Sequence, residues 1–272
     1  MSAIIRRMVP AANLTLLYGG LPVEARFEAA RADGFNAVEI LFPYDHSPQW
    51  YADRLAQHGL QLALLNTPID TTDSRWGYAA LPGRQAAFRE GFLKAAEVCE
   101  ATGCEAVHVM AGCVGGDNPE ARKTLLQNLA WAAGRHPEIR LQLEALNTFD
   151  VPGYYYSHPA AVRQVLDAAQ GLNAGLQFDF YHVVRQGLGL LRELDEALPY
   201  ICHVQVAGSP ARTEPDLARD SLHDGFQRLH EAGYRGYVGY EYRPADSITE
   251  GLRWATPLSN YFSPQSHRAS RL

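Results

Sequence analysis

The sequence predicts a single (β/α)8 TIM barrel, in which strand and helix alternate eight times along the chain. Short apolar runs rich in Val, Ile, Leu and Tyr are followed by longer segments whose apolar residues recur every three or four positions. This alternation is the pattern of buried strands joined by amphipathic helices. The length of 272 residues also fits one barrel, because barrels of this class commonly contain about 250 residues.

The predicted strands are short and almost continuously apolar. Such strands are typical of a parallel sheet whose outer face is covered by helices. An open doubly wound sheet is the alternative, but the turn after the first run, NLTLLYGGLPVE, contains no GxGxxG phosphate loop. We therefore favour a closed barrel. Its strands are expected to begin near Val9, Ala37, Leu60, Ala106, Arg140, Ala174, Ile201 and Gly236.

The intervening segments have helical periodicity, for example residues 21–34, 47–59, 83–103 and 220–236. Several end in glycine, the residue that favours the left-handed conformation at a helix C-terminus. No linker or repeat divides the chain, so we predict one domain over residues 1–272. After Trp254 the sequence becomes polar and rich in Pro and Ser, and residues 255–272 are predicted to form a loosely packed C-terminal tail.

The composition narrows the class of partner. Hydrophobic residues make up 47% and charged residues 20% of the chain, as in globular proteins with a large core. The formal net charge of -6 and the lack of a Lys/Arg run argue against nucleic acid as a partner. No apolar stretch approaches the ~20 residues of a membrane-spanning helix, and no secretion signal is evident. We expect a cytoplasmic protein that binds a small molecule, and a homo-oligomer is compatible with the sequence.

Polar residues close four of the predicted strands. Glu144, Asp179, Gln205 and Glu241 end the fifth to eighth apolar runs, and in such barrels the chemistry lies at the carboxyl ends of the strands. Carboxylates gathered without partners would repel one another, whereas a divalent cation between them keeps them ionised. The alternative is that each is a hydrogen-bonded strand-end residue, but four at equivalent places favour a metal site.

The donor types narrow the choice of metal. All four side chains bind through oxygen and none is a thiolate, which suggests magnesium or manganese rather than zinc. Three other residues are candidates for binding a substrate. His182 follows Asp179 by three residues, His108 lies within the fourth strand, and Asn66 ends the third. Ordinary structural hydrogen bonds could also account for these three.

Eight stretches of the chain match the motifs of a known family in order and spacing, almost from end to end: ANLTLLY, GFNAVEILFPYDH, LPGRQAAFREGF, HVMAG, LEALNTFDVPGYY, LQFDFYH, HVQVAG and YVGYEYRPADSITEGLRW. Through them the chain resembles the hydroxypyruvate isomerase family, within the xylose-isomerase-like barrels. The resemblance implies that Glu144, Asp179, Gln205 and Glu241 hold the metal, with Glu144 and Glu241 also acting as acid/base residues.

The implied reaction is an aldose-ketose type shift in a small hydroxy-oxo acid, for example between hydroxypyruvate and tartronate semialdehyde. Removing a proton from carbon is difficult, so the cation is expected to bind the substrate oxygens and stabilise an enediolate. One glutamate takes the proton and the other returns one on the opposite side of the substrate plane. No organic cofactor is needed.

Three loops depart from the family pattern, which leaves the substrate open. Barrel loops set specificity while strand ends carry out the reaction. Among the loop residues, Arg212, Glu214 and Arg75 are candidates for binding the substrate. The departures are Phe149 in place of the arginine of NTR, Thr213 and Asp216 to Asp220 after the seventh strand, and Ser74 to Gly77, where GERG is absent.

Three other functions are weighed. A ketose 3-epimerase or an inosose-type dehydratase would use the same metal site on a larger polyol, and Phe149 and Trp76 slightly favour it. A phosphodiesterase resembling endonuclease IV would need a histidine-rich metal cluster and a basic groove, and neither is evident. An inactive binding barrel is disfavoured because the acidic and amide residues are intact on all four strands.

Overall fold

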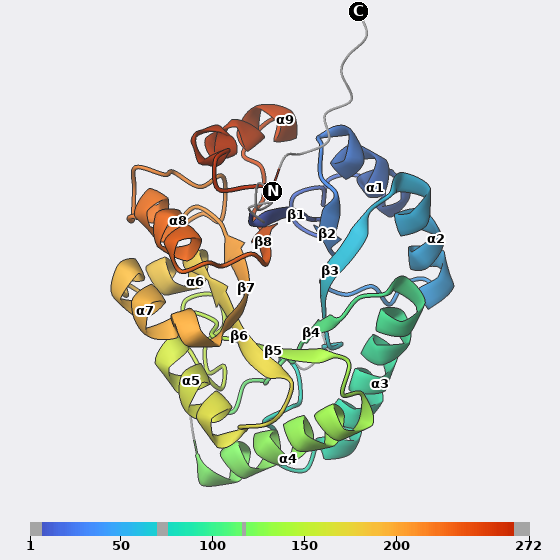
Figure 1. The fold of residues 1–272 in the computed structure, drawn as a ribbon. Helices are drawn as coiled ribbons and strands as arrows, with labels where there is room; N and C mark the ends of the chain where they lie inside the picture. The colour runs from blue at the N-terminus through green and yellow to red at the C-terminus, as the bar shows by residue number, and fades with distance from the viewer. Residues whose placement is uncertain (1–6, 70–75, 116–117, 264–272) are drawn as a thin grey trace, which may run out of the picture.

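The computed structural model describes residues 7–69, 76–115 and 118–263, which form one closed barrel ringed by helices (Figure 1). Neighbouring strands are parallel throughout, and β1 pairs with β8 to close the barrel. The predicted eight-stranded barrel is therefore confirmed. The strands are β1 Val9–Asn13, β2 Ala37–Glu39, β3 Gln61–Asn66, β4 Ala106–His108, β5 Arg140–Glu144, β6 Ala174–Asp179, β7 Ile201–Val206 and β8 Tyr237–Tyr240.

Helices cover the outside of the barrel and join successive strands. Ser47 and Asn118 accept hydrogen bonds from backbone N–H groups at the starts of α2 and α4, while Gly59 and Gly103 end α2 and α3 in the left-handed conformation, as predicted for these glycines. The α-helices are α1 Val23–Ala32, α2 Pro48–His58, α3 Gln85–Thr102, α4 Pro119–Arg135, α5 Pro159–Ala168, α6 Phe180–Arg185, α7 Leu190–Ala197, α8 Leu222–Glu231 and α9 Ile248–Gly251, with 3-10 turns at Leu198–Tyr200 and Leu252–Leu258.

Two predicted strands end earlier than their apolar runs. The side chain of Asn13 accepts hydrogen bonds from the backbone N–H groups of Thr15 and Leu16, so the chain turns immediately after β1. Asp179 accepts one from Tyr181 N at 2.8 Å and caps α6. The apolar run that follows Asp179 is therefore helical, because a side-chain cap competes with continued strand pairing.

The predicted loose tail is wrong for residues 255–263. Leu258 and Phe262 are buried, Met8 N donates to Tyr261 O, and Ser263 N donates to Met8 O. Aromatic packing of Phe262 against Tyr240 and Phe226 gives this segment a hydrophobic contact that outweighs its polar composition. Residues 264–272 lie outside the described part of the chain.

The inner face of the barrel is polar at its carboxyl end. Along β5, Leu141 and Leu143 belong to the core under the helices, whereas Gln142 and Glu144 alternate with them and face inward. Among the described helices, none is long and apolar enough to cross a membrane. The buried polar residues at or next to strand ends are Asn13, Glu39, Asn66, His108, Gln142, Glu144, Gln177, Asp179, His203, Gln205 and Glu241.

Candidate active site

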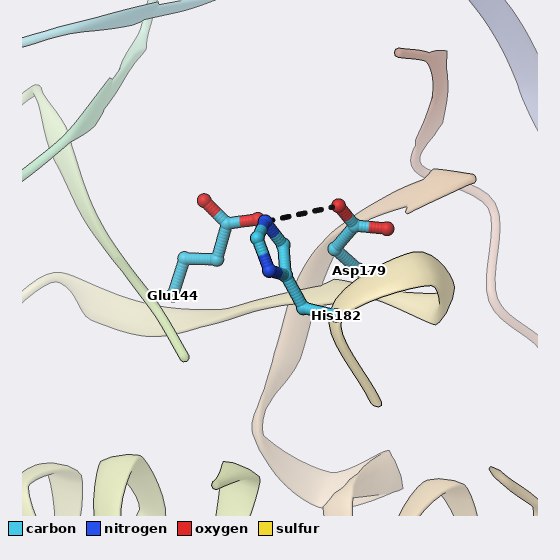
Figure 2. A group of neighbouring side chains, drawn as sticks. All are labelled: Glu144, Asp179 and His182. Atoms are coloured by element: carbon cyan, nitrogen blue, oxygen red, sulfur yellow. Dashed lines mark ion pairs between the residues drawn. The ribbon is translucent and has the colours of Figure 1, made fainter. Parts of the chain in front are cut away.

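Glu144, Asp179 and His182 form the closest group of potential ligands at the carboxyl end of the barrel. One atom from each side chain lies within 4.8 Å of the other two, and all three residues are buried. Figure 2 shows them converging from β5, β6 and α6. Among the described residues, Oε1 of Glu144 and Oδ2 of Asp179 have no hydrogen-bond partner. Two acceptors are thus buried without a donor, which is costly unless something else binds them.

His182 has a defined tautomer. The backbone N–H of Asn147 donates to Nδ1 of His182 at 3.0 Å, and Nδ2 of Asn147 lies 2.8 Å from the same atom. The orientation of the Asn147 amide is fixed, because its Oδ1 accepts from the N–H groups of Phe149 and Asp150. Nδ1 is therefore an acceptor, and the neutral ring carries its proton on Nε2.

This tautomer assigns a role to the other ring nitrogen. Nε2 of His182 lies 3.7 Å from Oδ2 of Asp179 and carries a proton, so it has no lone pair for a metal. Burial, with the charge of Arg212, lowers the pKa of His182 well below its usual value and keeps the ring neutral. His182 thus presents a hydrogen-bond donor at the centre of the site, and its contact with a substrate stays a prediction.

His108 lies beside Glu144. Its Nδ1 is 3.3 Å from Oε2 of Glu144, and both side chains are almost completely buried. Burial and the nearby His203 lower the pKa of His108 to about 3, so the ring is neutral at pH 7. Neither ring nitrogen has a hydrogen-bond partner among the described residues. His108 therefore has polar capacity left for a ligand next to Glu144.

Arg212 brings a positively charged side chain to the site. Its Nη2 atom lies 2.5 Å from Oε2 of Glu241 and 3.7 Å from Oδ2 of Asp179, and its guanidinium stacks on the ring of Tyr181. The hydroxyl of Tyr181 donates to Oδ2 of Asp150 at 2.7 Å. The loop after β7 thereby brings one positive charge between the carboxylates that follow β6 and β8.

The carboxylates have strongly raised pKa values. Burial raises the pKa of Glu144 well above its usual range, and the charges of Glu241 and Asp179 raise it further. Burial likewise raises the pKa of Glu241 to about 8 and that of Asp179 to about 6, although Arg212 opposes both shifts. Such shifts are common where carboxylates hold a cation or transfer protons.

Gln205 lies beside Asp179, since the two residues are partners in the register of β6 and β7. Its Nε2 donates to Oε2 of Glu39 at 3.1 Å, and its Oε1 accepts from Nε2 of Gln177 at 2.6 Å. The amide is fully buried. Of the four predicted ligands, Glu144 and Asp179 are in the closest group, Gln205 lies on the adjacent strand and Glu241 is paired with Arg212.

Two other predicted residues lie at the edge of this group or away from it. Asn66 ends β3, is buried and has an unpartnered Oδ1, so it has an acceptor to offer. Both oxygens of Glu214 instead accept a hydrogen bond from the backbone N–H of Ala245, which connects the loop after β7 to the loop after β8. Arg75 lies outside the described residues. Phe149 is 63% exposed under the guanidinium of Arg185, on the loop after β5.

Sequence reasoning missed Gln177 as a partner of the site. Gln177 precedes Asp179 by two residues, and residues two apart on a strand face the same side. The same spacing joins Gln142 to Glu144 and His203 to Gln205, so inward pairs were detectable. Asp150 and Tyr181 carried no comparable signal, because their contact joins a loop to a helix.

Comparison with known proteins gives the family. A family model described as "Xylose isomerase-like TIM barrel" matches residues 27–258. The chain belongs to this family. Curated relatives confirm the predicted resemblance to hydroxypyruvate isomerases. The chain is 38% identical to a 2-oxo-tetronate isomerase of Cupriavidus necator, with 91% of this chain and 97% of the relative covered. It is 32% identical to the hydroxypyruvate isomerase of Escherichia coli K12, with 91% and 98% covered.

Solved structures agree on the fold of this xylose isomerase-like barrel. A Brucella melitensis protein called "AP endonuclease, family 2" superposes with a TM-score of 0.85 at 33% identity, covering 92% of this chain and 98% of that one. A 3-keto-D-glucoside 4-epimerase from E. coli superposes with a TM-score of 0.70 at 18% identity, covering 92% and 99%. At that lower identity the likeness concerns the fold alone.

Proposed function

We propose that the chain is a metal-dependent isomerase of small 2-oxo acids with a hydroxyl on the next carbon, such as hydroxypyruvate or a 2-oxo-tetronate. The observation that carries the proposal is a pair of buried glutamates, Glu144 and Glu241, on either side of Asp179 at the carboxyl end of the barrel. Relatives of nearly the same length at 32% to 38% identity are named as isomerases of these two acids.

The residues fit a divalent cation. Glu144 Oε1 and Asp179 Oδ2 are buried acceptors without hydrogen-bond donors in the part of the chain that the structure describes, and Gln205 and Glu241 add oxygen atoms from the next two strands. An oxygen donor set favours magnesium or manganese. When bound, the cation would polarise the carbonyl group of the substrate and offset the mutual repulsion of the carboxylates.

The side chains can carry out the proton transfers. One glutamate accepts the proton from the hydroxyl-bearing carbon, the other donates a proton to the neighbouring carbon that was the carbonyl, and the hydroxyl proton passes to the former carbonyl oxygen. Without a cation, burial raises the pKa of Glu241 to about 8, and a bound cation would lower it, toward the range of a group that both accepts and donates protons near pH 7. Nε2–H of His182 donates to a substrate oxygen, and the burial of the group strengthens this interaction because few solvent dipoles compete with it.

The positive charge of Arg212 favours a substrate that carries a carboxylate. Its guanidinium is the charge closest to Glu241 and Asp179, and it lies on the loop that follows β7, where barrels place specificity residues. We propose that it holds the carboxylate of the oxo acid close to the reacting carbons. A 3-keto-D-glucoside 4-epimerase and a D-allulose 3-epimerase share the fold at only 18% and 19% identity, so we prefer an oxo acid as the substrate. Cytoplasmic location and homo-oligomer formation stay predictions.

The test is isotope exchange. The purified protein is incubated in deuterated water with Mn²⁺ or Mg²⁺ and with hydroxypyruvate, a 2-oxo-tetronate or a ketohexose, and the products are followed by NMR. We expect deuterium on the carbon next to the carbonyl of the oxo acids, together with the isomeric product. Exchange restricted to the ketohexose would favour the epimerase, and no exchange with any substrate would contradict the proposal.

A further inference from the structure

A completely buried carboxylate, Glu39, lies at the carboxyl end of β2 and contacts Gln205. Its Oε1 is 2.5 Å from Nε2 of His203, and its Oε2 accepts from Nδ2 of Asn13 at 3.1 Å and from Nε2 of Gln205 at 3.1 Å. The three partners come from β7 and β1, so Glu39 ties together strands that are not all neighbours in the sheet. All three of these partners of Glu39 are side chains on strands of the barrel.

The barrel is shaped to accept this carboxylate. A methyl group added to Gly239 in β8 would overlap both oxygens of Glu39. Glu39 therefore occupies space that a side chain on β8 would otherwise fill. Barrel interiors are usually packed with branched aliphatic residues, and such residues would fill this space without the desolvation cost of a charge. A structural role alone does not explain why a carboxylate is placed there.

The contact with Gln205 explains why a carboxylate, rather than an aliphatic side chain, occupies position 39. An amide has a donor end and an acceptor end, and either end can face a given neighbour unless that neighbour accepts only. The Glu39 oxygens accept from Asn13 and Gln205 and contact His203, so the NH2 of Gln205, rather than its carbonyl oxygen, faces Glu39. Oε1 of Gln205 then points the other way, and one lone pair remains after the bond from Gln177.

We propose that Glu39 is a positioning residue that orients the Gln205 amide so that its carbonyl oxygen serves the cation site. His203 and Asn13 hold the carboxylate, Gly239 gives it room, and Gln177 fixes Oε1 from the other side. The inference rests on the cation of the proposed function. Partners of this kind orient the groups that touch a metal, and their loss weakens metal affinity by about 10- to 100-fold.

The experiment measures Mn²⁺ affinity by calorimetry, with metal-free wild-type protein and Glu39→Gln. A glutamine fits the same space but offers one oxygen and one NH2 to three donors, so the Gln205 amide can rotate. We expect Mn²⁺ to bind Glu39→Gln at least about tenfold more weakly than wild type. Glu39→Asp, which keeps the charge but is too short to reach Gln205, should lose a similar factor and serves if Glu39→Gln does not fold.

The matched control is Asn128→Leu. Asn128 is also fully buried and donates to Ala79 O at 2.8 Å, but it lies in α4 away from the site. This variant should keep the wild-type affinity for Mn²⁺ whatever its thermal stability. Equal affinity in wild type, Glu39→Gln and Glu39→Asp would overturn the inference alone. Wild-type protein that binds no Mn²⁺ would overturn the metal in the proposed function and the inference with it.

Discussion

Arg212 and Glu241 form a close ion pair inside the barrel mouth, with Nη2 of the arginine 2.5 Å from Oε2 of the glutamate. The same nitrogen lies 3.7 Å from Oδ2 of Asp179. One guanidinium thus opposes the burial that raises the pKa values of both carboxylates. The protonation state of the site is therefore coupled to a loop residue.

Replacing Arg212 by glutamine should shift the pH dependence of the reaction. Without the guanidinium, the pKa values of Glu241 and Asp179 rise further, so a higher pH is needed to ionise them. We expect kcat/KM at pH 7 to fall by at least about 30-fold, as for removal of one partner from a buried charge pair. The acid limb of the profile of kcat/KM against pH should move to higher pH.

Arg163→Gln is the control for this change, because Arg163 pairs with Glu196 on the surface. Its pH profile should coincide with that of wild type. An acid limb that stays in place in Arg212→Gln would show that Arg212 does not set the ionisation of the carboxylates.

Without metal, the stability of the protein should depend on pH in a characteristic direction. Burial raises the folded-state pKa of Glu241 from 4.5 to about 8 and that of Asp179 from 3.8 to about 6. The folded protein then binds more protons than the unfolded chain between these values. The contribution of these two carboxylates to stability is highest below about pH 4 and decreases as the pH rises to about 8, by about 1.4 kcal/mol per pH unit for each proton. The lowered pKa values of His108 and His182 act in the opposite direction below about pH 6.5, so the net decrease is expected above that pH.

Thermal unfolding in a chelator at pH 5, 6, 7 and 8 would check this. We expect the melting temperature to fall between pH 7 and pH 8, and Mn²⁺ to raise it most at pH 8, where the carboxylates are ionised. A chelated protein that is most stable at pH 8 would contradict the prediction.

Glu144→Gln and Glu241→Gln should each abolish turnover while leaving the barrel folded. An amide is nearly the same size but cannot accept or return a proton at neutral pH, and general acid-base catalysis contributes about 100- to 10,000-fold. The measurements are kcat by product NMR and folding by circular dichroism. Glu90→Gln, on the surface of α3 beside Lys94, should retain full activity. Undiminished turnover in either site variant would remove that glutamate from the mechanism.

The variant His182→Gln distinguishes two possible roles of His182, a hydrogen-bond donor to the substrate and a metal ligand. Because Nδ1 of His182 is occupied by the N–H of Asn147, its Nε2 carries the proton and donates. We expect kcat/KM to fall by about 10- to 100-fold, as for a lost hydrogen bond from a donor in a buried site, while Mn²⁺ affinity stays within about twofold. A large loss of Mn²⁺ affinity would make His182 a ligand. His136→Gln, at the exposed His136, should change neither quantity.

The sequence was sufficient to predict the barrel and the strand ends that carry Glu144, Asp179 and Gln205. These predictions depend on hydrophobic periodicity, which is local, and on the rule that the carboxyl ends of parallel strands meet. The contact between Arg212 and Glu241 was not predictable in the same way. Arg212 lies on a loop with a positive φ of 55°, and the path of such a loop depends on tertiary contacts rather than on periodicity.

The tautomer of His182 and the orientation of the Gln205 amide could not be predicted from the sequence either. The sequence shows that His182 follows Asp179 by three residues, but the tautomer of His182 depends on a backbone N–H of a loop 35 residues earlier in the chain. Gln205 was predicted from its strand end, whereas the fixed orientation of its amide comes from Glu39, 166 residues away. Such long-range hydrogen bonds are set by the closure of the barrel.

Gly239→Ala should destabilise the barrel because of Glu39. The added methyl group would overlap the buried carboxylate, which is held by three donors and has little freedom to move, and overpacking of this kind typically costs about 1–3 kcal/mol. Gly134→Ala is the matched control. Gly134 lies in α4 with open space around its Cα, so alanine should stabilise the helix by about 0.5–1 kcal/mol. Urea unfolding of both variants measures the difference. If Gly239→Ala is as stable as wild type, Glu39 is mobile enough to move aside, and its packing against β8 does not fix its position.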